Sequence, residues 1–243
     1  MIKELDWDSK FFGYKIGSHQ GKPLEGKTAD EFVKEFHDKK FDCVYVFCDA
    51  KGWVCEQLKK NKHILSVGGH AEYELTKENW KRKGDGRTRD IRIFNKEVAA
   101  SNYNIAVEIK MISRSLVPIS RFYYDPRFKI RAEDMYEIWA DKIINSDQGE
   151  IAIEMIDGQV AGIIGYIMDK GIGRISLVKT KTVFEGRGVA SMLLDRALGN
   201  LFKSGASKIM VTTQADNKLA ERLYQNAGFE IKKITTIYHW WTK

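Results

Sequence analysis

The chain has 243 residues and a formal net charge of +7, and 43% of its residues are hydrophobic and 30% are charged. This balance is typical of a globular protein and excludes disordered, collagen-like and coiled-coil chains. No stretch of about 18 uncharged apolar residues occurs, and the first residues lack the apolar core of a signal peptide. We therefore expect neither a membrane-spanning helix nor a leader.

Cysteine usage and charge narrow the compartment and the partners. Cys43, Cys48 and Cys55 are odd in number and show no CxxC spacing, which predicts reduced, mostly buried thiols in a cytosolic protein. The positive charge favours nucleic acid, an anionic membrane or phosphorylated small molecules as partners. Basic residues cluster only within residues 81–89, and no nucleic-acid motif accompanies them. Phosphorylated small molecules are therefore expected, with no nucleic acid and no membrane.

The first part of the chain predicts alternating short strands and helices. In chain order we expect an extended segment, a helix, a buried strand, a short helix, an extended stretch and a polar linker. These cover residues 5–16, 28–40, 43–48, 53–60, 64–75 and 77–90. Thr28 and Glu31 form a capping box at the start of the first helix. The linker predicts a small N-terminal α/β domain over residues 1–89 and a second domain over residues 90–243.

The second part predicts a strand, two helices, a three-stranded meander and then helix, strand, helix and two strands. An aromatic, arginine-bearing loop separates the first two helices, and Asp157-Gly158 predicts a hairpin turn in the meander. The elements before the meander cover residues 91–94, 103–116, 120–129 (the loop) and 132–145. The later ones cover residues 151–155, 160–168, 175–180, 189–201, 208–213, 217–227, 229–234 and 237–241. The class is therefore mixed α/β.

A glycine-bearing turn before a helix gives the sharpest local signal. It consists of Glu185, Gly186, Arg187, Gly188, Val189 and Ala190. The two glycines allow the backbone to wrap closely around a ligand, and the helix start offers unpaired N–H groups to a pyrophosphate. A glycine turn without a ligand is the alternative. A dinucleotide fingerprint is excluded because Ser191 replaces its third glycine and no acid follows, and no Walker A sequence occurs.

The second signal is the segment of residues 216–229, DNKLAERLYQNAGF. Its apolar positions lie on one helical face, so Tyr224 taken by itself is interpreted more readily as a core aromatic with a bonded hydroxyl than as a catalytic residue. The order and spacing of the two signals together carry more information than either one.

Together these motifs resemble the GCN5-related N-acetyltransferase (GNAT) superfamily. The family's loop motif, Gln/Arg-x-x-Gly-x-Gly/Ala, falls on residues 185–190. Its downstream motif falls on Asn217, Ala220, Leu223, Tyr224, Gly228 and Phe229. Glu185 departs from the family's Gln or Arg and places a carboxylate near a phosphate site. The resemblance implies a GNAT fold, with a central, mostly antiparallel sheet and flanking helices, after a small N-terminal domain.

The resemblance also implies a donor and roles for individual residues. Acetyl-CoA would place its pyrophosphate on residues 185–190 and its pantetheine along the strand near Val178 and Thr180. Asn217 would contact the same molecule, and Tyr224 would act as general acid beside the sulfur. An amine would attack the thioester directly. A phenol and a thiol are close enough in ordinary pKa for such a proton transfer.

Residues 5–13, 120–128 and 136–139 resemble a subfamily, the dTDP-fucosamine acetyltransferases and their relatives. Those enzymes acetylate the amino group of a dTDP-4-amino-4,6-dideoxyhexose, a nucleotide-linked amino sugar. Arg121 and Tyr123 offer a cation and an aromatic surface for such an acceptor. Packing residues and surface charges are the competing interpretation of the same loop.

Several alternatives stay open. The acceptor is another amine in one of them (an aminoglycoside, a polyamine or a protein N-terminus), and in another the chain is a non-catalytic acyl-CoA-binding module. The five histidines are isolated, so no metal is expected; His70 and His239 are interpreted as exposed or satisfied sheet residues. Residues 238–241 fit both a strand paired across a homodimer and a strand packed internally.

Overall fold

A single ten-stranded sheet organises the computed structural model, which describes residues 2–19, 29–49, 63–82 and 88–242. The strand order is β1-β2-β3-β10-β4-β9-β8-β7-β6-β5, and the neighbours are antiparallel except β2 with β3 and β8 with β9. The strands are β1 (Lys3–Glu4), β2 (Ile16–His19), β3 (Cys43–Asp49), β4 (Ile64–Leu75), β5 (Asp90–Phe94), β6 (Gly149–Ile156), β7 (Gln159–Asp169), β8 (Ile172–Thr180), β9 (Lys208–Gln214) and β10 (Glu230–Trp241). The predicted mixed α/β class with a mostly antiparallel sheet is confirmed.

Helices pack on both faces of this sheet. They are α1 (Asp6–Phe12), α2 (Ala29–Asp38), α4 (Lys96–Ser101), α5 (Tyr103–Arg114), α6 (Arg121–Tyr124), α7 (Pro126–Ile144), α8 (Val189–Lys203) and α9 (Lys218–Ala227). α8 and α9 share one apolar core with β4 and β6–β9, while α5 and α7 share another with β5–β8. Within the described ranges, every helix is too short or too polar to cross a lipid bilayer.

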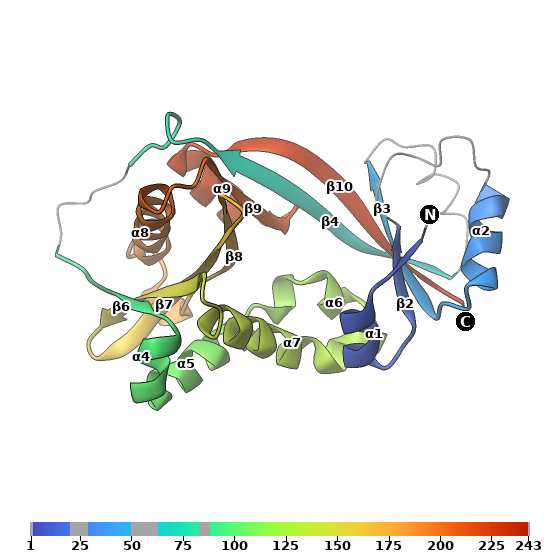
Figure 1. Ribbon diagram of the computed structural model, residues 1–243, viewed down its shortest axis with the longest axis horizontal. Helices are drawn as coiled ribbons and strands as arrows, with labels where there is room; N and C mark the ends of the chain where they lie inside the picture. The colour runs from blue at the N-terminus through green and yellow to red at the C-terminus, as the bar shows by residue number, and fades with distance from the viewer. Residues whose placement is uncertain (1, 20–28, 50–62, 83–87, 243) are drawn as a thin grey trace.

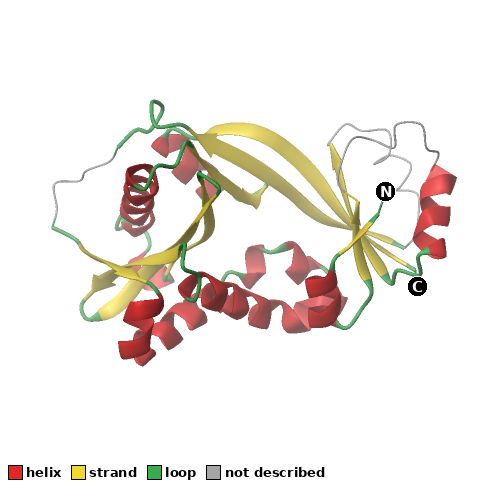
Figure 2. Cartoon of the chain, viewed as in Figure 1, coloured by secondary structure: helices red, strands yellow, loops and turns green. Residues whose placement is uncertain are grey.

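The long strands β4 and β10 connect the two ends of the molecule (Figures 1 and 2). β10 is one strand with two register shifts, near Lys233 and Tyr238, where the sequence predicts two strands. It pairs with β3 on one side and with β4 on the other, so the internal packing of residues 238–241 is the alternative that the structure shows. A homodimer stays a prediction.

The extended structure predicted for residues 5–16 is wrong, because residues 6–12 form α1. Trp7 and Phe11, four residues apart, stack with ring centroids 5.0 Å apart, as one helical face requires. Gly13 then ends the helix with a φ of 77°. A repeat of aromatic residues every four positions was the helical signal in this segment.

The loop predicted for residues 120–129 is also wrong, since it is helical over most of its length. Ser120 caps α6 by accepting a hydrogen bond from the Phe122 N–H at 3.2 Å. Asp125 caps α7 by accepting from the Arg127 N–H at 3.0 Å, with Pro126 in the first turn. Serine and aspartate at cap positions, followed by proline, are helix-start signals that the aromatic composition obscured.

Most other predicted elements are confirmed within a few residues, including the hairpin, where Asp157 and Gly158 both have positive φ. Cys43 and Cys48 are buried and neither forms a disulfide. The cap at Thr28, the helix over residues 53–60 and Cys55 lie outside the described residues. The boundary between residues 89 and 90 stays a prediction; β4, from the first part, lies between β9 and β10 of the second.

Residues 79–81 cross the ends of α8 and α9. The Trp80 indole donates to Asp195 at 3.1 Å and packs against Phe202, and the Lys81 N–H donates to the Ala227 carbonyl at 3.0 Å. The segment therefore attaches the first part of the chain to the helices of the second.

Gly228 is the position where this attachment leaves least room. It ends α9 with a φ of 99°, and a side chain there would collide with the carbonyl oxygen of Asn79. We predict that Gly228→Ala lowers the free energy of unfolding by about 3 kcal/mol, from the left-handed backbone and the clash together. Gly171 is the matched control, because its φ is 78° but its neighbourhood is open. Equal losses in denaturant unfolding of the two variants would contradict the predicted clash.

Candidate active site

β8 and β9 separate along their length. The parallel pairing covers only Ile172–Ile175 opposite Lys208–Val211, although β8 continues to Thr180 and β9 to Gln214. The other edge of β8 remains paired with β7 as far as Thr180. One edge of residues 176–180, including Val178 and Thr180, therefore faces an opening in the sheet. The Thr180 hydroxyl is buried and has no hydrogen-bond partner among the described residues.

The turn after β8 presents a row of unpaired N–H groups. Gly186 and Gly188 have φ values of 77° and 80°, and Gly188 is the N-cap of α8 without a side-chain capping bond. No N–H from residue 186 to residue 191 donates to another described residue; the first bond of the helix is from Met192 to the Gly188 carbonyl at 3.1 Å. Such a row of amides at the N-terminus of a fifteen-residue helix favours an anion.

The remaining loop residues differ in exposure. Val189 is buried and begins the packed face of α8, and Ala190 is partly buried. Glu185 and Arg187 are exposed, with the Arg187 guanidinium 5.4 Å from the centre of the Phe184 ring. The Glu185 carboxylate therefore lies in solvent, where water screens its charge.

A buried ion pair supports this turn by bonding one of its backbone carbonyls. The Arg89 guanidinium contacts the Glu154 carboxylate at 2.7 Å, and their side chains are only 10% and 3% exposed. Arg89 also donates to the Arg187 carbonyl at 3.1 Å. Arg89 and Glu154 could not be recognised as site residues from the sequence. The two partners of Arg89, Glu154 and Arg187, are 65 and 98 positions away, and no local pattern connects them.

Asn217 is engaged in the fold. As the N-cap of α9 it accepts from the Ala220 N–H at 3.1 Å, and its amide donates to the Thr213 hydroxyl at 3.3 Å. These bonds join the start of α9 to β9. One amide proton remains for a ligand.

Tyr224 is a buried aromatic residue whose hydroxyl has no partner among the described residues. Its ring is buried on α9, with centroids 5.7 Å from Tyr73 and 5.6 Å from Phe229. Its hydroxyl makes no hydrogen bond with the described residues, so the bonded core aromatic is not what is found. Burial, with a smaller contribution from Tyr73, raises the pKa of Tyr224, which keeps the phenol protonated at neutral pH. Tyr73 is a neighbour that the sequence analysis did not single out.

Arg121 and Tyr123 both lie on α6 but in different surroundings. The Arg121 guanidinium is 4.1 Å from the ring centres of both Tyr45 and Phe122 and 2.9 Å from His239 Nε2. Tyr123 is partly buried, with the Lys129 ammonium 4.1 Å from its ring centre. His239 is a satisfied, fully buried sheet residue, whereas His70 is partly buried.

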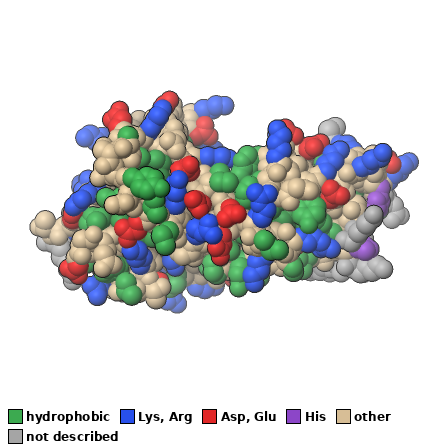
Figure 3. Space-filling view, turned by 90° about the horizontal axis from the view of Figure 1, so that it is seen from below, with side chains coloured by type: hydrophobic (Ala, Val, Ile, Leu, Met, Phe, Trp, Pro, Cys, Tyr) green, Lys and Arg blue, Asp and Glu red, His purple; other side chains and the backbone are tan. Residues whose placement is uncertain are grey.

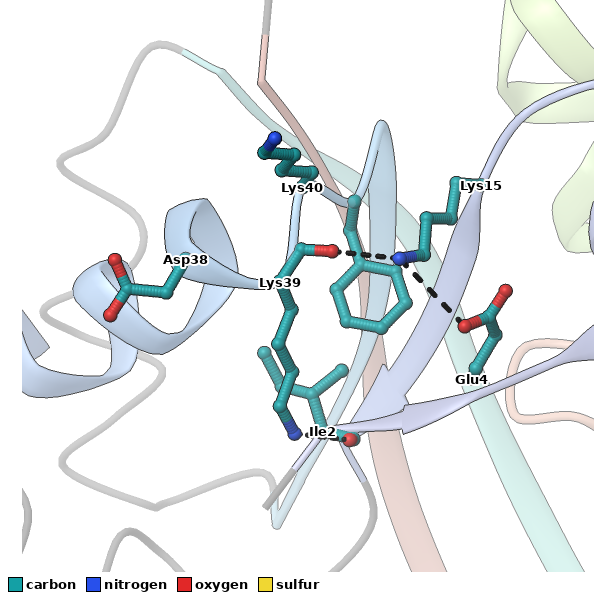
Figure 4. A pocket seen from close by; sticks show the side chains of 7 residues that line it. Ile2, Glu4, Lys15, Asp38, Lys39 and Lys40 are labelled. Atoms are coloured by element: carbon teal, nitrogen blue, oxygen red, sulfur yellow. Dashed lines mark hydrogen bonds and ion pairs between the residues drawn. The ribbon is translucent and has the colours of Figure 1, made fainter.

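One surface hollow lies away from these residues. It measures about 500 Å³ and is lined by Ile2, Glu4, Lys15, Asp38, Lys39, Lys40 and Phe41 (Figure 4). Lys15 donates to the Lys39 carbonyl at 2.9 Å, and Lys39 donates to the Ile2 carbonyl and to Glu35. Two of the three ammonium groups that line the hollow, those of Lys15 and Lys39, therefore already have partners.

Basic and acidic side chains are interspersed on the face that carries α5 and α7 (Figure 3). Arg114, for example, bonds Glu133, Asp134 and Glu137. No group of three or more His, Cys, Asp or Glu side chains in the described part could hold a metal. The expectation of no metal stays a prediction.

Comparison with known proteins places these features in a family. Residues 116–229 match the acetyltransferase (GNAT) family model. Over 136 residues the chain is 26% identical to the spore coat polysaccharide biosynthesis protein SpsD of Bacillus subtilis (strain 168), a match that covers 54% of this chain and 45% of SpsD. The chain therefore spans less than half the length of that relative.

Two solved structures share the fold over most of the chain. A conserved protein of unknown function from Staphylococcus epidermidis ATCC 12228 has a TM-score of 0.65 at 12% identity, covering 93% of this chain and 84% of that one. A GCN5-related N-acetyltransferase from Kribbella flavida has a TM-score of 0.55 at 12% identity, covering 94% and 80%. The family match extends over β8, the turn that follows it and α9, so residues 116–229 match the GNAT family of acetyltransferases.

Proposed function

We propose that this acyltransferase moves the acetyl group of acetyl-CoA to the amino group of a nucleotide-linked amino sugar, a dTDP-4-amino-4,6-dideoxyhexose. The observation that carries the donor half is the row of unpaired N–H groups at residues 186–191, next to the open edge of β8. The family that residues 116–229 match uses acetyl-CoA, and this geometry fits that donor.

The described residues fit the parts of acetyl-CoA in order. The amides of residues 186–190 hold the pyrophosphate, the Arg187 side chain adds a positive charge, and Glu185 stays in solvent. The open edge of β8 near Val178 and the unsatisfied Thr180 hydroxyl bind the pantetheine amides. Asn217 contributes its remaining amide proton. The loss of hydrogen bonds with water is thereby compensated along the whole donor.

Transfer then needs an amine, an oxyanion donor and an acid. The acceptor amine attacks the thioester carbonyl, and a backbone N–H on the open edge of β8 stabilises the developing oxyanion. The Tyr224 hydroxyl donates its proton to the departing thiolate. The acylated nitrogen releases its extra proton to water, and the Tyr224 phenolate takes up a proton from water before the next turnover. Ordinary thiols have a pKa of about 8.5 and phenols of about 10, and burial raises the pKa of Tyr224 further. The transfer is therefore uphill, and a short hydrogen bond to the sulfur makes it feasible.

The proposed acceptor is supported by other observations than the donor. SpsD is named for polysaccharide biosynthesis, which agrees with a sugar acceptor. Arg121 and Tyr123 supply a cation and an aromatic face on α6, and Tyr45 and His70 come from the first part of the chain. We propose that residues 1–89 form a small domain that supplies one wall of the acceptor site. The reaction takes place in the cytosol, in keeping with Cys43 and Cys48, which are not in a disulfide.

Thr180→Val tests the donor site without disturbing the fold. Valine has the same shape, and it removes a buried hydroxyl that has no partner in the described residues. We expect unchanged or slightly higher thermal stability and a Kd for acetyl-CoA raised about 3-fold to 10-fold, the value of one hydrogen bond. Calorimetric titration measures this change. A Kd equal to that of the parent enzyme would remove Thr180 from the donor site.

Tyr224→Phe tests the acid. We expect kcat to fall about 10²-fold to 10⁴-fold, with little change in the Kd of acetyl-CoA, because the ring and its packing remain. The matched control is Tyr73→Phe, which removes the neighbouring hydroxyl. A large loss of kcat in the control and none in Tyr224→Phe would assign the proton to Tyr73 instead.

The raised pKa of Tyr224 also predicts a pH profile. An acid must be protonated, and a phenol with a raised pKa loses its proton only at more alkaline pH. We therefore expect kcat to show no decline from Tyr224 deprotonation up to about pH 10. A descending limb near neutral pH that disappears in Tyr224→Phe would contradict this role.

The function itself is tested by thiol release from acetyl-CoA, with and without dTDP-4-amino-4,6-dideoxygalactose, followed by mass analysis of the product. We expect acceptor-dependent release and a mass gain of one acetyl group. No release, with acetyl-CoA binding demonstrated in the same sample, would reject this acceptor. Activity with another amine, or binding without transfer to any amine, would then decide between the remaining alternatives.

A further inference from the structure

Arg121 is a partly buried cation without a carboxylate at ion-pair distance among the described residues. Its guanidinium lies between the rings of Tyr45 and Phe122, each centre 4.1 Å from Cζ, and also faces the Phe47 ring at 5.8 Å. The one hydrogen bond it makes within the described ranges goes to His239 Nε2 at 2.9 Å. A guanidinium has five N–H donors, so several of them remain for a ligand.

The partner of Arg121 is held in one orientation. Because a guanidinium only donates, His239 Nε2 must accept, and its Nδ1–H then donates to Asp125 Oδ2 at 2.7 Å. The same carboxylate oxygen accepts from the Trp241 indole at 3.0 Å. Asp125 and the His239 ring are completely buried. The chain from Asp125 through His239 therefore fixes where the Arg121 guanidinium points.

Among the described residues, no anionic group contacts the Arg121 guanidinium to balance its charge. Burial lowers the pKa of His239 to about 4, against weaker opposing effects of Asp125, so the imidazole is neutral at pH 7. Burial and the charge of Arg121 lower the pKa of His70 to about 4 as well. The carboxyl of Asp8 feels the charge of Arg121, but burial raises its pKa, and it lies beyond ion-pair distance. A buried cation without a contacting anion is costly for a protein to maintain.

The position of Arg121 relates it to the reacting atoms. α6 packs against β4, and His70 on β4 lies opposite Gln214, the last residue of β9. Tyr73, three residues further along β4, contacts Tyr224 on the other face of the sheet. Three residues of a strand span about 10 Å, so α6 and Tyr224 contact neighbouring parts of the same strand, β4. A small acceptor can therefore reach both the thioester and Arg121.

We infer that Arg121 binds an anionic group of the acceptor, a phosphate of its diphosphate, and that His239 and Asp125 are positioning residues for this contact. The inference rests on the proposed function, since it assigns the place of the acceptor's negative charge. Planar guanidinium and phosphate form paired N–H···O bonds, and stacking between two rings limits the rotation of the guanidinium. The sequence alone indicates Arg121 as a candidate contact but does not explain its orientation.

Titration of dTDP, and separately of inorganic pyrophosphate, into enzyme saturated with CoA tests this site, because CoA occupies the competing row of amides. We expect both probes to bind, and Arg121→Gln to raise both Kd values at least tenfold. The matched control is Arg131→Gln, since Arg131 also stacks on an aromatic ring, that of Phe11 at 4.3 Å, and bonds the Phe11 carbonyl. We expect Arg131→Gln to leave both Kd values unchanged.

The positioning residues need a readout that a purely structural role would not change. His239→Phe keeps an aromatic ring at this position but removes the Nε2 atom that accepts from Arg121. We expect this variant to raise the Kd of dTDP 3-fold to 10-fold and to leave the Kd of acetyl-CoA and the circular-dichroism spectrum unchanged. Asp125→Asn should have a smaller effect of the same kind. If either variant fails to fold, Arg121→Lys remains decisive: it keeps the charge but loses the fork of donors, and it should bind dTDP less tightly than the parent enzyme.

The outcomes separate this inference from the proposed function. Equal binding of both probes by the parent enzyme and Arg121→Gln, or no binding by the parent enzyme, would overturn the anion site. Arg121-dependent binding of the probes together with failure to acetylate the dTDP-amino sugar would support the site and reject the sugar. Binding of pyrophosphate but not of dTDP would support the anion contact while excluding the nucleotide as its source.

Discussion

The pairing of β10 with both β3 and β4 is the constraint on which the remaining structure depends. Residues 235–240 form ladders on both sides, so the strand joins the first part of the chain to the second through backbone hydrogen bonds. Antiparallel register fixes which side chains reach each face, because a shift of one residue would reverse every one of them. This register places His239 beneath α6 and, through β4, brings Tyr73 to Tyr224. Long-range pairing of a chain terminus therefore assembles both halves of the candidate site.

The two halves of the candidate site, the turn before α8 and the cluster around Arg121, use different physical means to attract negative charge. The turn before α8 relies on backbone N–H groups and the helix dipole, so it depends little on side-chain identity and tolerates Glu185. The cluster around Arg121 relies on one formal charge held by aromatic rings and a neutral imidazole. The first suits a donor common to a whole family. The second suits an acceptor that only some members use, because a single side chain decides it.

In both halves of the candidate site, residues that do not face the ligand hold the groups that do. Arg89 and Glu154 hold the turn before α8 through the Arg187 carbonyl, and Asp125 holds His239. Each support is a buried charged group with at least one hydrogen-bond partner, since a buried charge without partners would cost several kcal/mol. Such supports keep a site in its binding geometry before the ligand arrives, which reduces the entropy that binding must overcome. They are also the residues that local sequence patterns do not reveal.

The sequence by itself determined the features that depend on near neighbours. The hairpin at Asp157-Gly158, the glycine turn before α8 and the amphipathic face of α9 follow from turn geometry and helical periodicity. It also determined the family, because two short motifs at a fixed separation report one backbone arrangement. The same local logic failed at residues 5–16 and 120–129, where abundant aromatic residues concealed ordinary helix-start signals.

Only the tertiary structure decided which distant residues meet. Nothing near His239 in the sequence indicates Asp125 or Arg121, which are 114 and 118 positions away. Nothing near Tyr224 indicates Tyr73. Hydrogen bonds and ring contacts of this kind depend on sheet order and register, which the whole chain sets by burying its apolar faces together. The local sequence therefore determined what each segment could bind, and the order of the strands decided which of those segments form one site.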